Sequence, residues 1–79
     1  MKETMHRYQF LVFIERDEDG IYVATCPALQ GCYTQGDTYQ EALDNIREAI
    51  ELHIEARLQV GEPIPLLQEV GFERVQVTV

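Results

Sequence analysis

Two thiols are the side chains in this sequence best suited to metal or redox chemistry. Cys26 and Cys32 have five residues between them, including a proline and a glycine. A structural zinc site takes about four nitrogen or sulfur ligands, with cysteines roughly two to four residues apart, and a thioredoxin-type pair requires Cys-x-x-Cys. Neither pattern is present, and His6 and His53 add no spacing typical of a zinc module. We therefore predict that both cysteines are small, half-buried residues that flank a turn. A disulfide between them in oxidised samples is left open.

A second candidate is an acidic turn whose spacing resembles the start of a calcium-binding loop. Glu15, Asp17, Asp19 and Gly20 would fill positions 1, 3, 5 and 6 of an EF-hand loop. Such a loop needs a bidentate Glu at its twelfth position, where this sequence has Cys26. The segment before the turn also has the pattern of a strand and not of a helix. We interpret the acidic residues as a solvated hairpin tip.

The third candidate is His53, which lies among the apolar positions of a predicted helix, one turn before Arg57. General-base catalysis needs an orienting acid and a nearby nucleophile, and the sequence offers only scattered threonines and cysteines. Glycine-rich phosphate loops and serine-centred elbows are absent. We interpret His53 as a core or interface residue, and predict no catalytic residue, metal or cofactor. The competing hypothesis is an enzyme or small-ligand protein that uses these thiols or His53.

One face of the same predicted helix carries four carboxylates, which we call the acidic ridge: Asp44, Glu48, Glu51 and Glu55. Its members form two like-charge pairs at i,i+4, and each pair is unfavourable by about 0.2–0.5 kcal/mol. Only Arg47 interrupts the run of negative charge. A solvated outer face explains such a ridge, and so does a docking strip for a basic partner.

These residues must be positioned by a small set of elements. Aromatic and β-branched residues predict a first strand at 8–15, covered on both sides, with Tyr8, Phe10, Val12 and Ile14 on one face. A turn ending at Gly20 leads to a returning strand at 21–25. After a connection that contains Pro27 and Gly31, a short third strand is predicted at 32–35, ended by Gly36 and Asp37.

A long helix follows, and its two ends are marked by typical capping residues. Thr38 and Glu41 have the spacing of a capping box, in which the Thr38 hydroxyl accepts from the Glu41 amide and Glu41 reaches back. Gly61 suits the position after the helix end, and Pro63 prevents its continuation. Alternating valines at 74–79 predict a terminal strand with one buried face. The predicted fold is α+β, in the order β-β-β-α-β: one domain, 1–79, with a mostly antiparallel sheet and one long helix on one face.

Composition restricts the partners that this domain can have. The chain has 79 residues, with 6 Lys and Arg against 14 Asp and Glu, which gives a net charge of −8. Scattered basic residues argue against direct nucleic-acid binding, and no apolar run approaches the roughly 20 residues of a membrane span. The start of the chain lacks a signal-peptide core, and two cysteines without an export signal predict a cytoplasmic protein with reduced thiols. Because so small a core leaves apolar surface exposed, we predict a homodimer or higher homo-oligomer.

Together, the turn, cap and core positions resemble the HicB-like antitoxin family. The pattern is P-x-L-x-G-C-x-T-x-G-D-T, then E-A-L-x-N-x-x-E-A-I, then G-E-P-I-P. Its residues here are Pro27, Leu29, Gly31, Cys32, Thr34, Gly36, Asp37, Thr38, Glu41, Ala42, Leu43, Asn45, Glu48, Ala49, Ile50 and 61–65. The likeness covers about residues 8–65. Each motif is weak alone, but their order and spacing together are specific.

The resemblance implies a reduced relative of the RNase H fold without nuclease activity. It also implies a partner: a HicA-type toxin, small and basic, which has a double-stranded-RNA-binding fold and cleaves mRNA with a catalytic histidine. The antitoxin would cover that active site and RNA surface. Full-length members continue into a DNA-binding domain, whereas this sequence stops at Val79, so we expect a short stand-alone member that binds no DNA by itself. The alternative is a stand-alone oligomeric HicB-like protein without a toxin partner.

Overall fold

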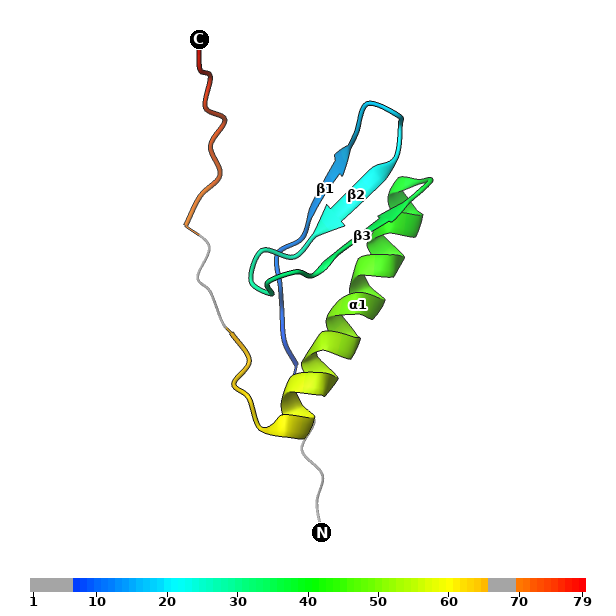
Figure 1. The fold of residues 1–79 in the computed structure, drawn as a ribbon, viewed down its shortest axis with the longest axis vertical. Coiled ribbons are helices and arrows are strands. Elements are labelled where there is room, and N and C mark those ends of the chain that lie inside the picture. Colours follow the sequence, from blue (N-terminus) through cyan, green and yellow to red (C-terminus); the bar gives the residue numbers. More distant parts are fainter. Residues whose placement is uncertain (1–6, 66–69) are drawn as a thin grey trace.

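Three short antiparallel strands and one long helix make up the folded body of the molecule (Figure 1). The structure is a computed structural model that describes residues 7–65 and 70–79. Strands β1 (Phe13–Arg16), β2 (Tyr22–Thr25) and β3 (Tyr33–Gly36) form a sheet in the order β1-β2-β3. The helix α1 (Tyr39–Val60) follows and packs mainly against β3 and β2. The predicted α+β class, with three antiparallel strands followed by one long helix, is therefore confirmed.

The β1–β2 hairpin is closed by the acidic turn, whose first carboxylate has a structural role. Asp17 Oδ1 accepts from the backbone N–H groups of Asp19 and Ile21, each at 2.9 Å. Gly20 has a φ of 84°, a left-handed conformation that glycine adopts without steric cost. The register continues from this turn and places Arg16 opposite Tyr22 and Phe13 opposite Thr25. The side chain of Asp17 is thus used to shape the hairpin.

The core lies between the sheet and α1 and is centred on the connection from β2 to β3. Its buried members come from that connection, from β2 and from one face of the helix: Ala24, Cys26, Leu29, Cys32, Ala42, Ile46 and Ile54. The loop is held by its own backbone, because Leu29 N–H donates to the Cys26 carbonyl and Cys32 N–H donates to the Leu29 carbonyl, both at 3.1 Å. Gly31 takes a positive φ of 77° within this turn. Both cysteines are more deeply buried than the sequence indicated, with 1% and 6% exposure.

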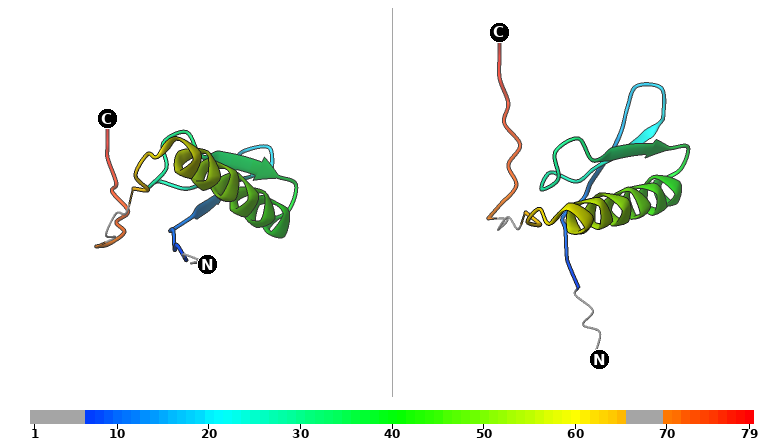
Figure 2. Two further views of the ribbon diagram at one scale, coloured as in Figure 1. Left: turned by 90° about the horizontal axis from the view of Figure 1, so that it is seen from below. Right: turned by 60° about the horizontal axis from the view of Figure 1, so that its bottom comes forward.

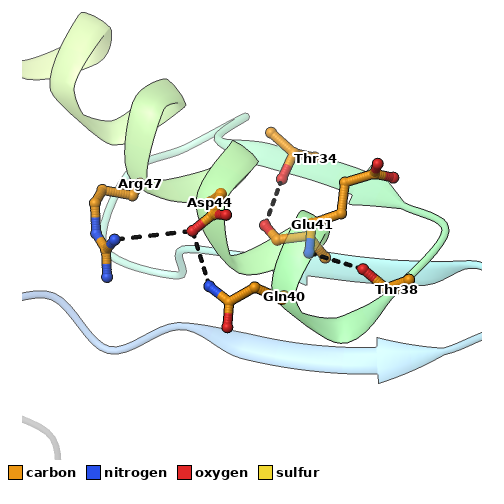
Figure 3. A network of polar contacts seen from close by, with 7 residues as sticks. Thr34, Thr38, Gln40, Glu41, Asp44 and Arg47 are labelled. Carbon is orange, nitrogen blue, oxygen red and sulfur yellow. Dashed lines mark hydrogen bonds and ion pairs between the residues drawn. The ribbon is translucent and has the colours of Figure 1, made fainter.

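The junction between β3 and α1 is held by several side-chain and backbone contacts (Figure 3). The Glu41 N–H donates to Thr38 Oγ1 at 3.0 Å, as the capping box predicts. The return bond differs by one residue, because Glu41 Oε1 accepts from the Asp37 N–H at 2.6 Å. The sequence predicted that Gly36 would follow the third strand, but Gly36 belongs to β3 as its last residue. A Cβ at Gly36 would lie 2.7 Å from the Ala42 nitrogen, so glycine is needed for the close approach of strand and helix.

The first strand is shorter than predicted, and its outer face is covered only in part. β1 begins at Phe13, because its pairing with β2 starts at Phe13 and Thr25. Pro27, which has no backbone N–H to donate, follows two residues after Thr25. Residues 8–12 still place Tyr8, Phe10 and Val12 against the core, as the alternation indicated. The other face is covered only in part, because Phe72 contacts the Phe13 ring edge-on but leaves Phe13 38% exposed.

The strand predicted at 74–79 is not formed within this chain. Residues 70–79 make no ladder with the sheet, and all of them are exposed. In Figures 1 and 2 most of this segment lies apart from the sheet, on its β1 side in Figure 1, while Phe72 near the start of the segment contacts Phe13 of β1. The prediction of a terminal strand buried in its own sheet is wrong for the single chain, because alternation indicates a strand-forming segment but does not identify its partner.

Candidate protein-binding surface

The residues considered for chemistry do not converge on a reactive site in the part of the chain that the structure describes. Cys26 N–H donates to the Cys32 carbonyl at 3.0 Å, and the two side chains are thiols and not a disulfide. Burial raises the pKa of the Cys32 thiol above its ordinary value, and the nearby Cys26 raises it further. A raised pKa disfavours the reactive thiolate. Among residues 7–65 and 70–79, no group of three or more His, Cys, Asp or Glu side chains could hold a metal ion. His6 lies outside the described residues.

His53 has a structural contact at the end of the helix. Its Nε2 accepts from Arg57 Nε at 2.9 Å, and Arg57 Nη1 donates to the Pro63 carbonyl at 2.9 Å. The Gly61 and Glu62 N–H groups cap the last turn by donating to the carbonyls of Leu58 and Arg57. This set of contacts fixes the direction in which the chain leaves α1. The sequence identified Gly61 and Pro63 as end signals but did not identify the His53–Arg57–Pro63 connection.

The acidic ridge is exposed along the middle three turns of α1. All four of its carboxylates, from Asp44 to Glu55, are on the solvent side of the helix. Asp44 accepts from Gln40 Nε2 at 2.9 Å and lies 3.9 Å from Arg47 Nη1 (Figure 3). That contact is the only ion pair among the described residues. Because a single exposed pair is worth at most about 1 kcal/mol, most of the ridge charge stays uncompensated.

Next to the ridge, residues 8–12 and α1 form an apolar groove that the sequence did not reveal. We define the groove by Tyr8, Phe10 and Val12 on one side and by helix residues Leu43, Ile46, Ile50, Ile54 and Leu58 on the other. It consists of two adjoining hollows of about 370 and about 400 Å³, which share Tyr8, Phe10, Ile50 and Glu51. Glu51 lines both hollows, Glu55 lines the second and Arg47 lines the first.

The groove and the ridge therefore form one surface with an apolar floor and a negative rim. The lining side chains are mostly apolar, and its charged members lie on exposed positions of α1. Protein–protein contacts have this composition, with an apolar centre and a polar border. The sequence predicted the groove residues to be part of the core. Alternation shows which side of the strand a residue faces, but it does not show how completely the helix covers that side. Across 7–65 and 70–79, no helix is both long and apolar enough to cross a membrane.

Several known proteins have sequences similar to this chain. Residues 10–77 match the family described as HicB_like antitoxin of bacterial toxin-antitoxin system. A UPF0150 protein of Synechocystis is 50% identical over 58 residues, which cover 73% of each chain. A UPF0150 protein of Thermoplasma acidophilum is 53% identical over 57 residues, which cover 72% of this chain and 83% of the relative. The Antitoxin HicB 1 of Photorhabdus laumondii is 35% identical over 69 residues, 87% of this chain but 44% of that antitoxin.

The fold agrees with this grouping. The crystal structure of the N-terminal domain of Burkholderia pseudomallei antitoxin HicB superposes with a TM-score of 0.66. The two chains are 29% identical, and the match covers 75% of this chain and 69% of the other. Three findings indicate the same family. They are the three-strand and helix fold, the turn and cap residues on which the resemblance rested, and the family match over residues 10–77. This chain belongs to the HicB-like antitoxin family of bacterial toxin–antitoxin systems.

Proposed function

We propose that this chain is an antitoxin that neutralises a small, basic HicA-type toxin by covering its active site and its RNA-binding surface. The observation that carries the proposal is the acidic ridge beside the apolar groove, with Glu51 and Glu55 belonging to both. A toxin that binds RNA needs a positively charged surface. The ridge is complementary to such a surface in charge, and the groove can accept apolar side chains at its centre.

The proposed mechanism is physical obstruction in the cytoplasm, with no bond made or broken by this chain. The net charge of −8 attracts a basic partner over a distance, and an exposed ridge concentrates that attraction on one face. Like-charge pairs along α1, which cost stability in the free protein, are relieved when cationic side chains dock against them. In this proposal the three-strand sheet with its helix is a reduced RNase H-like unit that acts by binding.

The direct cellular test is co-expression with a HicA-type toxin encoded beside this protein. We expect restored growth and co-purification of the two chains. A variant with the four ridge residues made neutral (Asp44→Asn, Glu48→Gln, Glu51→Gln and Glu55→Gln) should protect cells less well. Continued toxicity in the presence of folded wild-type protein would contradict the antitoxin function.

A binding measurement can distinguish the effect of the acidic ridge on association from the effect of total net charge. A matched control removes four exposed carboxylates elsewhere: Glu18→Gln, Asp19→Asn, Glu62→Gln and Glu73→Gln. Both variants change the net charge from −8 to −4. We expect the ridge variant to associate with the toxin about tenfold or more slowly at low salt, with a weaker salt dependence, and the control to change much less. Equal effects from both variants would assign the attraction to net charge and remove the ridge from the mechanism.

The second candidate function is a stand-alone oligomeric HicB-like protein without a toxin. It is favoured by the lengths of the relatives, since the match covers 73% and 83% of two UPF0150 proteins but 44% of Antitoxin HicB 1. This alternative predicts a homo-oligomer that shows no affinity for a HicA-type protein, whereas the antitoxin function predicts a stable complex.

A further inference from the structure

The segment 70–79 has the composition of a buried strand but is exposed in the single chain. Val75 and Val77 are 79% and 76% exposed, and Val79 continues the same alternation. Three valines on one side of an extended segment form an apolar stripe. Its exposure is unfavourable, because burying one valine side chain contributes about 1.5–3 kcal/mol relative to leaving it in water. We call Val75, Val77 and Val79 the valine stripe. Its alternate neighbours, Gln76 and Thr78, are polar.

The sheet has an unpaired edge on the side where this segment lies. β1 pairs with β2 on one side only, and the Asp17 N–H donates to the Ile21 carbonyl at 2.9 Å. Since opposed residues of an antiparallel ladder alternate between bonded and non-bonded pairs, Glu15 and Phe13 face β2. The backbone groups of Ile14 and Arg16 therefore point outward. An exposed edge of this kind is a template for another strand.

The two surfaces are compatible in charge, and the segment reaches the β1 edge. Segment 70–79 contains one acidic and one basic residue, Glu73 and Arg74, and residues 7–16 contain Arg7, Glu15 and Arg16. Neither part shares the strong negative charge of the acidic ridge, so like-charge repulsion between copies is small here. In Figure 1 segment 70–79 runs in the same general direction as β1. Phe72 also makes an edge contact with Phe13 of β1, with ring centroids 5.2 Å apart.

We propose that residues 74–79 form the missing fourth strand by adding to the β1 edge of a second copy of this chain, in a reciprocal strand exchange. In the single chain the valine stripe is exposed and β1 forms an edge of the sheet. A reciprocal exchange buries the stripe and pairs the β1 edge in each copy. Apolar faces become buried, and outward backbone groups of β1 gain hydrogen-bond partners. The contact uses the sheet edge and leaves the acidic ridge available, so it is independent of the proposed toxin binding.

The first test compares two substitutions in adjacent positions of the segment. Val77→Asp places a charge in the stripe, and Thr78→Asp places the same charge on its polar side. By sedimentation equilibrium, the wild type and Thr78→Asp should be dimers at tens of micromolar, while Val77→Asp should dimerise at least about tenfold more weakly. Circular dichroism should show the same helix content in all three. A chain ending at Glu73 provides a second variant with the expected loss of dimer.

The second test shows whether the strand crosses between copies. In a dimer made from isotope-labelled and unlabelled chains, isotope-filtered nuclear Overhauser effects should connect valine methyls of the stripe with β1 of the other copy. A wild type of 9.1 kDa throughout this concentration range would overturn the proposal. Equal effects of Val77→Asp and Thr78→Asp on dimerisation would also overturn it. Contacts found only within one chain would overturn it as well, because the strand would then dock on its own sheet.

Discussion

Two segments of this chain were each predicted to contribute a strand, but their surroundings differ. The run from Cys26 to Gly36 is held by hydrogen bonds within its own turn, by pairing with β2 and by close contact with the first turn of α1. The run from Val75 to Val79 has a clear alternation of valines, yet it is exposed throughout. The difference lies in the distance along the chain to a partner. β3 meets β2 across one short loop, whereas residues 74–79 follow a 22-residue helix and a proline-containing connection.

This comparison shows what local sequence can determine. Where partners are close in sequence, turn and cap residues bring them together with little loss of loop entropy. Where they are distant, the same alternation indicates only that a segment will form a strand once an edge is available. Substitutions in the first segment should therefore change the stability of the isolated domain, and substitutions in the second should change association.

The largest effect is expected at the strand–helix junction. Gly36→Ala places a methyl group 2.7 Å from the Ala42 nitrogen and 3.0 Å from Glu41 Cβ, so the helix must move away from β3. We expect a loss of about 2 kcal/mol in the free energy of unfolding and a Tm lower by roughly 8–16 °C. Thermal unfolding measures this.

Gly71→Ala is the matched control for that substitution. A Cβ at Gly71 meets no atom within 4 Å, and its Tm should stay close to that of the wild type. Equal Tm values for Gly36→Ala and wild type would show that the junction is less closely packed than the distances indicate.

The next largest effect is expected at the helix cap. Thr38→Ala removes the hydroxyl that accepts from the Glu41 N–H at 3.0 Å and should cost about 1 kcal/mol. Thr38→Ser keeps the acceptor and should retain most of that stability in urea unfolding. If alanine and serine proved equivalent, the cap would have no role in stability.

A smaller, pH-dependent effect is expected at the buried thiols. The pKa of Cys32 is raised from 9.0, first by burial and then by Cys26. The unfolded thiol therefore loses its proton at a lower pH than the folded one, and the stability that this group contributes is complete below pH 9.0 and is lost as the pH rises through the folded pKa.

The check is urea unfolding of the wild type and Cys32→Ala at about pH 8 and about pH 10.5. The wild type should lose more stability than the variant between these two conditions. An equal loss in both proteins would show that Cys32 does not titrate differently on unfolding.

The smallest effect on the isolated domain is expected from the second segment. Removing residues 74–79 should leave the unfolding free energy of the dilute monomer within about 0.5 kcal/mol, because the valine stripe is exposed there. At high concentration the full chain should gain stability by dimerisation and the shortened chain should not. A large loss of stability in dilute solution would mean that the segment packs on its own sheet.

Much of the fold could be predicted from the sequence because its signals are local. The Thr38–Glu41 cap, the turn at Gly20 and the helix end at Gly61 depend on residues within a few positions of each other. The length of β1 could not be predicted, since it depends on where β2 ends. The close contact at Gly36 depends on how the helix packs across the strand, and the unpaired terminal segment depends on an absent partner.

The candidate site was predicted only in part. The acidic ridge follows from helical periodicity, and its exposure agrees with the structure. The groove beside it requires knowledge of how residues 8–12 lie along α1, which no short-range pattern gives. That these two features bind a toxin stays a proposal.

The most direct test of this function is inhibition of RNA cleavage in vitro. Purified HicA-type toxin would be mixed with increasing amounts of the wild type, of the ridge variant and of the charge-matched control. We predict that the wild type and the control stop cleavage near one antitoxin chain per toxin, and that the ridge variant requires a large excess. Undiminished cleavage in the presence of excess folded wild-type protein would contradict the account.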